Sequence, residues 1–175
     1  MVTTNTDVYA TDFYAWCLTT AQLVRTGQWD EIDPEALAEE LESVGRSQKR
    51  ELESRLEVLL IHLLKWQYQP ERRVDSHSWY DTILEQRSQI VRLLRDNPSL
   101  RPQVPNLLQE IYPEARARAH GQMGLVETHS QAHGAIAPLV PLELPDVAFR
   151  LRLPPDCPWA ATEVLDKEFW PLPLS

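Results

Sequence analysis

One long amphipathic segment, residues 34–68, most constrains how this chain can fold. Asp33 followed by Pro34 is a typical helix start, because an acid caps free N–H groups and proline fits the first turn. Apolar residues then recur at three- and four-residue spacing, with no proline until Pro70. The positions on this face are Leu37, Leu41, Val44, Gln48, Leu52, Leu56, Leu59, Leu63 and Trp66. We predict one helix, roughly 50 Å long at about 1.5 Å per residue.

Shorter helices are predicted on both sides of this segment. The first covers residues 7–25 and ends at Gly27, because glycine commonly terminates helices. Another covers residues 77–95. A further helix covers residues 99–120, where Pro113 predicts a kink or a division into two shorter helices. The sequence therefore predicts an all-α fold, an antiparallel helical bundle built around the long helix.

The composition changes after this helical part. Residues 121–158 hold six prolines and three glycines, which predicts a small irregular or β-hairpin extension near 122–155. The tail, 159–175, is apolar, and we expect it to pack on the helices. We interpret residues 1–175 as one domain with a helical core at 7–120.

Charge and composition narrow the functional classes. The net charge of −9 argues against nonspecific nucleic-acid binding, which needs an excess of basic residues. Two cysteines without a pairing pattern favour a reducing compartment. The start of the chain shows no signal-peptide pattern, and no apolar run approaches the roughly 20 residues that span a bilayer. We therefore expect a cytoplasmic protein without a membrane partner.

The end of the long helix and the following turn combine aromatic, basic and amide side chains. The candidate binding residues are His62, Lys65, Gln69, Arg72, Arg73, Trp79 and Arg87. Arginines at a turn can bind a carboxylate or phosphate, and the aromatic rings could supply a stacking wall. The alternative is a structural corner in which Trp66 and Trp79 pack against each other. In that interpretation Arg72 and Arg87 pair with acids such as Glu39, Glu42 or Glu85.

No complete catalytic set is evident, and no cofactor motif occurs. Glu39 and Glu42, at i and i+3, could offer oxygen ligands to a divalent metal ion, but a matching second acidic pair is missing. We therefore favour a solvated acidic first turn as the explanation of these two residues. The leading hypothesis is a non-enzymatic interaction or regulatory protein. The alternative is a metal-dependent helical phosphohydrolase or nuclease that uses these two acids.

The partner itself is not named by the sequence. The long helix exceeds what a small bundle needs to cover, so a second copy of the chain is a candidate partner beside an unidentified protein.

Several motifs along the chain resemble one bacterial family. They are Asp12-Phe13-Tyr14-Ala15-Trp16, Glu39-Glu40-Leu41-Glu42-Ser43-Val44-Gly45-Arg46-Ser47, His62-Leu63-Leu64-Lys65-Trp66-Gln67-Tyr68-Gln69-Pro70, Ser78-Trp79, Glu85-Gln86-Arg87, Cys157-Pro158-Trp159 and Phe169-Trp170-Pro171. Together they resemble the family called domain of unknown function 29, which is abundant in cyanobacteria. The resemblance covers roughly residues 8–120 and 155–171 and implies a mostly helical fold. It implies no activity and no catalytic residue.

Overall fold

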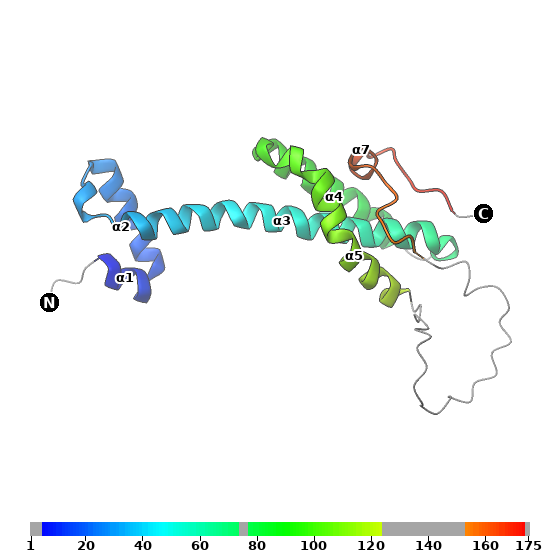
Figure 1. The fold of residues 1–175 in the computed structure, drawn as a ribbon, viewed down its shortest axis with the longest axis horizontal. Helices are drawn as coiled ribbons and strands as arrows, with labels where there is room; N and C mark the ends of the chain where they lie inside the picture. Colours follow the sequence, from blue (N-terminus) through cyan, green and yellow to red (C-terminus); the bar gives the residue numbers. More distant parts are fainter. Residues whose placement is uncertain (1–4, 74–76, 124–152, 174–175) are drawn as a thin grey trace, which may run out of the picture. The chain divides into compact units, whose positions relative to one another are not determined.

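The computed structural model describes residues 5–73, 77–123 and 153–173, and these form helices and connecting turns without a strand (Figure 1). The α-helices are α1 (Asn5–Thr11), α2 (Phe13–Thr26), α3 (Pro34–Tyr68), α4 (His77–Asp96), α5 (Val104–Gln122) and α7 (Ala161–Leu165). The 3-10 helices are η1 (Trp29–Glu31), η2 (Pro70–Arg72) and η3 (Pro98–Gln103). The predicted all-α fold is confirmed. The β-hairpin suggested near 122–155 falls mostly on residues 124–152, outside the described residues.

The long helix α3 has the predicted start and extent. The Asp33 carboxylate accepts hydrogen bonds from the backbone N–H groups of Glu35, at 3.1 Å, and Ala36, at 3.2 Å. These bonds satisfy donors that have no partner inside the helix. The helix then runs for 35 residues without interruption, through Gly45.

The predicted first helix, residues 7–25, is wrong as one element, because α1 and α2 are separated at Asp12. The Asp12 carboxylate accepts a hydrogen bond from the Ala15 N–H at 3.0 Å and so caps a new helix. Aspartate competes with the backbone in this way and therefore starts helices more readily than it continues them. Gly27 ends α2 as predicted, in the left-handed conformation with φ of 71°.

The predicted division into two helices at Pro113 is wrong, and a kink at Pro113 stays a prediction. Residues 98–103 form the 3-10 helix η3, and α5 begins at Val104 and runs through Pro113. Pro105 lies in the first turn of α5, where a missing N–H costs little. The cluster of prolines therefore shortens the α-helix at its start instead of breaking it in the middle.

Contacts divide the chain into two compact units, and α3 contributes to both. The N-terminal unit is Met1–Gln48 and the C-terminal unit is Lys49–Ser175. In the C-terminal unit, α4, α5 and α7 gather around the second half of α3 (Figure 1). Whether the two units unfold together, as the predicted single domain would, stays a prediction.

The C-terminal unit has an extensive apolar core. Its members include the fully buried leucines of α3, which are Leu52, Leu56, Leu59, Leu60, Leu63 and Leu64. Trp159 and Val164 from the chain end are also buried there, and Phe169 and Trp170 pack against the core while partly exposed. Tyr112 of α5 donates a hydrogen bond to the Pro154 carbonyl at 3.0 Å, which ties the chain end to the helices.

The N-terminal unit has only a small core. Trp16 is 2% exposed and makes ring contacts with Tyr9, at 4.8 Å between centroids, and Phe13, at 5.7 Å. The Tyr9 hydroxyl donates to the Glu40 carboxylate at 2.6 Å and so links α1 to α3. Within the described residues of the whole chain, no helix is long and apolar enough to cross a membrane.

Candidate functional site

The predicted aromatic-basic residues all lie in the C-terminal unit, at the end of α3, in or directly beside η2, and in α4. We call His62, Lys65, Gln69, Arg72, Arg73, Trp79 and Arg87 the aromatic-basic cluster. The structure brings several of them into contact. The Lys65 ammonium lies 4.7 Å from the centre of the Trp79 ring, and the Arg73 guanidinium lies 4.6 Å from that of Trp66. Both distances are typical of cation–π contacts.

Most polar groups of the aromatic-basic cluster are bonded within the fold. His62 donates from Nδ1 to the Val58 carbonyl at 2.8 Å, and burial lowers its pKa. The Lys65 ammonium donates to the side-chain oxygen of Gln122 at 3.1 Å, and burial, followed by the nearby Arg72 charge, lowers its pKa. The Lys65 bond therefore links α3 to α5, whereas the His62 bond stays within α3.

Gln69 and Arg73 also bond to the backbone. Gln69 is 6% exposed and donates to the Met123 carbonyl at 3.3 Å. Arg73 donates from Nε to the Trp66 carbonyl at 2.7 Å, at the C-terminal end of α3, where a cation is favourable. Burial lowers the Arg73 pKa. The Gln69 Oε1 and Arg73 Nη2 atoms are buried without a hydrogen-bond partner in the described part of the chain.

Arg87 is fully buried, at 0% exposure. It donates from Nε to the Val164 carbonyl at 2.9 Å and from Nη2 to the Phe169 carbonyl at 2.8 Å. The predicted pairing of Arg87 with Glu39, Glu42 or Glu85 is therefore wrong. Carbonyls at and beyond the end of α7 carry partial negative charge, so they can hold the guanidinium without a carboxylate. Burial lowers its pKa, which Asp166 partly opposes.

The rings at this end of α3 are arranged differently from the prediction. Trp79 is 8% exposed, as expected, but Trp66 is only partly buried. The ring contacts of Trp66 are with Tyr80, at 6.3 Å, and Trp170, at 4.8 Å. Tyr80 and Trp170 stack at 4.9 Å. The C-terminal tail thus supplies the ring that the prediction assigned to Trp79. Arg72 is exposed on the adjacent turn.

The acidic pair Glu39 and Glu42 lies on the exposed surface of α3 in the N-terminal unit. Glu42 forms an ion pair with Arg46 at 3.0 Å, one helical turn away. In residues 5–73, 77–123 and 153–173, no group of three or more His, Cys, Asp or Glu side chains could hold a metal ion. The geometry of the described residues therefore lends no support to the metal-dependent alternative.

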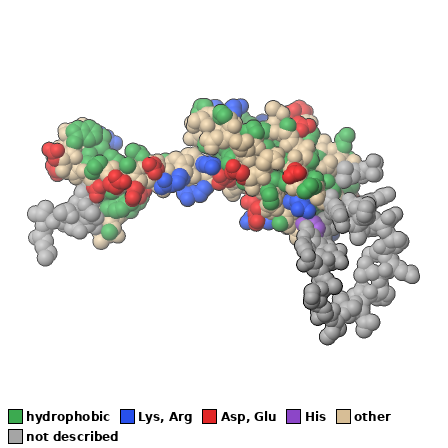
Figure 2. All heavy atoms as spheres, viewed as in Figure 1, with side chains coloured by type: hydrophobic (Ala, Val, Ile, Leu, Met, Phe, Trp, Pro, Cys, Tyr) green, Lys and Arg blue, Asp and Glu red, His purple; other side chains and the backbone are tan. Residues whose placement is uncertain are grey.

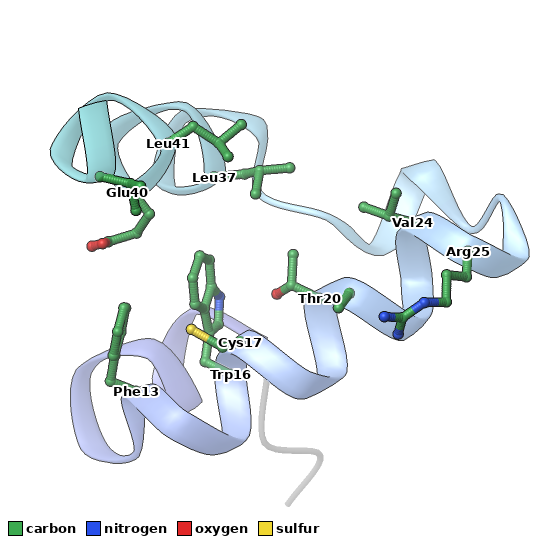
Figure 3. A pocket seen from close by; sticks show the side chains of 11 residues that line it. Phe13, Trp16, Cys17, Thr20, Val24, Arg25, Leu37, Glu40 and Leu41 are labelled. Atoms are coloured by element: carbon green, nitrogen blue, oxygen red, sulfur yellow. The ribbon is translucent and has the colours of Figure 1, made fainter. Parts of the chain in front are cut away.

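A groove lies in the N-terminal unit, between α2 and the first half of α3, and the sequence did not predict it (Figure 3). Its volume is about 490 Å³. Its lining is mostly apolar: Phe13, Trp16, Cys17, Thr20, Ala21, Val24, Arg25, Leu37, Glu40, Leu41 and Val44. Cys17 is half-buried in this lining. We call this feature the apolar groove.

The side chains around the apolar groove are unusually exposed for their type. Leu41 is 66% exposed, Val44 62% and Phe13 50%. Most of the large exposed apolar side chains in the described residues belong to this unit, with Tyr14, Leu18, Val24 and Trp29 completing its set. Figure 2 shows apolar side chains next to acidic ones over this part of the molecule. This surface therefore combines exposed apolar side chains with acidic ones.

Family comparison extends over both units. The family model described as "Domain of unknown function DUF29" matches residues 8–170. The chain belongs to the DUF29 family. This confirms the resemblance carried by the sequence motifs, and it brings no activity with it. No curated protein and no solved structure matches the chain.

The apolar groove and the aromatic-basic cluster of this DUF29 chain both contain residues of the motifs that resemble the family. The segment Glu39 to Ser47 supplies the α3 side of the apolar groove, and Asp12 to Trp16 supplies part of the α2 side. One sequence signal could have located the groove. The apolar stripe of α3 starts at Leu37, well before the part of the helix that α4 and α5 cover. The first turns of α3 therefore had no predicted partner except the helix that precedes them in the chain.

Proposed function

We propose that this DUF29 protein is a non-enzymatic interaction protein of the bacterial cytoplasm that docks a partner in the apolar groove. The observation that carries the proposal is the exposure of Leu41, Val44 and Phe13 around one cavity. Contiguous exposed apolar surface is costly in water and marks interaction sites on soluble proteins. Covering it stabilises a complex by roughly 25 cal/mol for each Å² of apolar surface removed from water.

The aromatic-basic cluster supports a binding role less well. Lys65, Gln69 and Arg87 are held by internal hydrogen bonds, so a partner would have to compete for them. Arg72, a member of the cluster, is exposed. Tyr80, which is not a member, is 45% exposed. A partner could contact these two side chains beside Trp170. We therefore place the primary docking site in the apolar groove and regard the cluster as a secondary surface.

A photo-crosslinking experiment tests the proposal directly. A photoreactive phenylalanine analogue replaces Val44 in cells that make the protein naturally, and a second strain carries it at Val91. Val91 is the matched control, because it is a helical valine of α4 that is 44% exposed and does not belong to the groove lining. We expect a discrete crosslinked product from position 44 and none from position 91. Products absent from both positions, or equal at both, would contradict the proposal.

A further inference from the structure

We infer that the occupant of the apolar groove is a second copy of this chain, held antiparallel so that the Arg25 end of each groove meets the Glu40 end of the other. This inference rests on the proposed function, because it names the partner of the same groove. Three observations carry it: the small core of the N-terminal unit, the spacing of the residues that line the groove, and the positions of the two charged residues in that lining.

The N-terminal unit buries little apolar surface of its own. Among residues 8–48, Trp16 and Leu23 are the only buried apolar side chains. Units of this size are marginally stable alone, and oligomerisation is a common way to complete their core. Covering the exposed Leu41 and Val44 would extend the core of this unit.

Both walls of the groove carry the spacing of a helix–helix interface. Their lining residues recur at alternating intervals of four and three positions. The residues at this spacing are Phe13, Cys17, Thr20 and Val24 on α2 and Leu37, Leu41 and Val44 on α3. Side chains spaced in this way form the seams along which helices pack in coiled coils and four-helix bundles. The groove therefore suits helices as its occupant, and α2 and α3 of a second copy carry the matching spacing.

The exposed acids of α3 do not oppose this pairing. With about 3.6 residues per turn, Glu35, Glu39 and Glu42 lie on the side of the helix opposite Leu37 and Leu41. Two copies that meet through their grooves therefore keep these carboxylates away from the interface.

The lining itself holds one acid and one base, and they lie toward opposite ends of the groove. Figure 3 shows the Glu40 carboxylate on the side of Phe13, whereas Arg25 lies at the other end, beside Val24. The Tyr9 hydroxyl donates to Oε1 of Glu40 at 2.6 Å. A carboxylate accepts several hydrogen bonds, so Oε2 can still accept one from a guanidinium.

A two-fold axis across the groove makes these two ends complementary. In a symmetric dimer, each contact between two different residues occurs twice, once in each direction. With the two grooves antiparallel, Arg25 of each copy meets Glu40 of the other, and both contacts are attractive. With the grooves parallel, like charges would meet at both ends, which is costly. The antiparallel pair brings α2 and α3 of both copies together as a four-helix interface.

The groove is short, so we expect a weak dimer with a dissociation constant of roughly 1–10 µM. Well below that concentration the chain is monomeric, and Leu41 and Val44 are exposed as they are in the structure. Stability measured on dilute protein therefore describes the monomer.

Sedimentation equilibrium of the full-length protein from about 0.1 to 100 µM tests the inference. We expect the wild type to change from monomer to dimer over this range. Arg25→Glu and Glu40→Lys should each weaken dimerisation about tenfold or more, because each replaces two attractive contacts with two repulsive ones. An equimolar mixture of the two variants should dimerise about as tightly as the wild type, because opposite charges then face each other at both ends.

Two control variants separate charge pairing from other effects. Arg92→Glu makes the same change of charge at an exposed position of α4 and should alter the dissociation constant by less than about twofold. Tyr9→Phe removes the hydroxyl that bonds to Glu40 without changing any charge, and it should also leave dimerisation within about twofold. Circular dichroism of every variant separates a failure to fold from a failure to dimerise.

The apolar contact is tested by a second set of variants. Leu41→Gln combined with Val44→Gln should weaken dimerisation about a hundredfold or more, because symmetry removes each apolar anchor twice. Val91→Gln, on α4, is the matched control and should leave the dissociation constant unchanged.

The cysteine in the groove lining provides an independent measurement. Cys17 should be alkylated more slowly above the dissociation constant than below it, because the second copy covers it. Cys157 serves as an internal reference, since its thiol is half-buried, donates to the Trp159 carbonyl at 3.5 Å and has a pKa raised by burial. Its alkylation rate should not depend on protein concentration.

A protein that stays monomeric up to about 100 µM would overturn the inference. A dimer that the groove variants leave intact, single charge variants that dimerise like the wild type, or a mixture that shows no recovery would also overturn it.

The photo-crosslink from position 44 keeps the two proposals apart. A product of twice the chain mass that contains only this chain supports both proposals. A product that contains a different protein overturns the inference and leaves the proposed function standing. The absence of any product contradicts the proposed function itself.

Discussion

The two halves of α3 share one apolar stripe and yet have opposite environments. In the second half, Leu56 and Leu60 are 0% exposed in the core of the C-terminal unit. In the first half, Leu41 is 66% exposed and Val44 62%. The helix and the periodicity of its apolar stripe are the same in both. What differs is the number of elements that pack against each half.

This difference shows what an apolar stripe can and cannot indicate. Helical periodicity reports which face of a helix avoids water, and it does not report what covers that face. Here α4, α5 and the chain end cover the second half, while the first half meets mainly α1 and α2. The less covered part of the stripe is therefore where we propose that a partner docks.

The largest expected effect comes from a matched pair of leucines on α3. Leu56→Ala should destabilise the protein by about 3–5 kcal/mol, through lost burial and the cavity that remains. Leu41→Ala makes the same change in helix propensity at an exposed site and should change stability by less than about 0.5 kcal/mol. Urea denaturation of the purified variants measures both. Equal losses would break the comparison, because they would mean that the first half is covered in solution.

Arginines give a second pair with a smaller expected difference. Arg87→Ala should cost about 3 kcal/mol, because the Val164 and Phe169 carbonyls lose a charged donor inside the fold. Arg46→Ala removes only an exposed ion pair with Glu42 and should cost about 0.5 kcal/mol. Thermal melts followed by circular dichroism compare them. A small effect of Arg87→Ala would show that the chain end is not held by this residue.

The sequence predicted the helices well because their signals are local. Asp33 and Pro34 fix the start of α3, and Gly27 fixes the end of α2, through bonds and backbone conformations within a few residues. Asp12 was misread because an acid in the middle of an apolar pattern can either face solvent or cap a new helix. That choice depends on the packing of α1 against α3.

The candidate site was harder to predict because its contacts are distant along the chain. Arg87 bonds to carbonyls about eighty residues later, at Val164 and Phe169, and no local spacing encodes a backbone acceptor. Trp170 likewise reaches Trp66 and Tyr80 from the tail. A sequence rich in basic and aromatic residues therefore suggested a binding site where the structure largely shows internal bonding.

The pH dependence of stability should reflect the buried half of α3. Burial lowers the pKa of His62, so the folded state favours its neutral form. The contribution of His62 to the free energy of unfolding is complete above the unfolded pKa of about 6.5. It is lost as the pH falls below that value, by at most about 1.4 kcal/mol per pH unit. His62→Gln should therefore reduce the loss of stability between about pH 6.5 and 5. Urea midpoints of both proteins over this range measure it, and parallel curves would contradict the assignment.

The smallest expected effect tests whether the two halves of α3 fold as one. Gly45 lies in the exposed half, and a Cβ added there would meet nothing within 4 Å, so Gly45→Ala should favour the helix by about 0.5–1 kcal/mol. If the units unfold together, urea denaturation should show this gain in the global free energy of unfolding. If the first half opens independently, amide exchange should slow only near residues 36–48, with the global free energy of unfolding unchanged.

Gly27→Ala is the opposite control, because its φ of 71° is strained for alanine and the same two measurements should show a loss of stability. A gain confined to residues 36–48 would separate the two halves energetically as well as structurally. A loss of stability on Gly45→Ala would show that the exposed half is packed against something at that position.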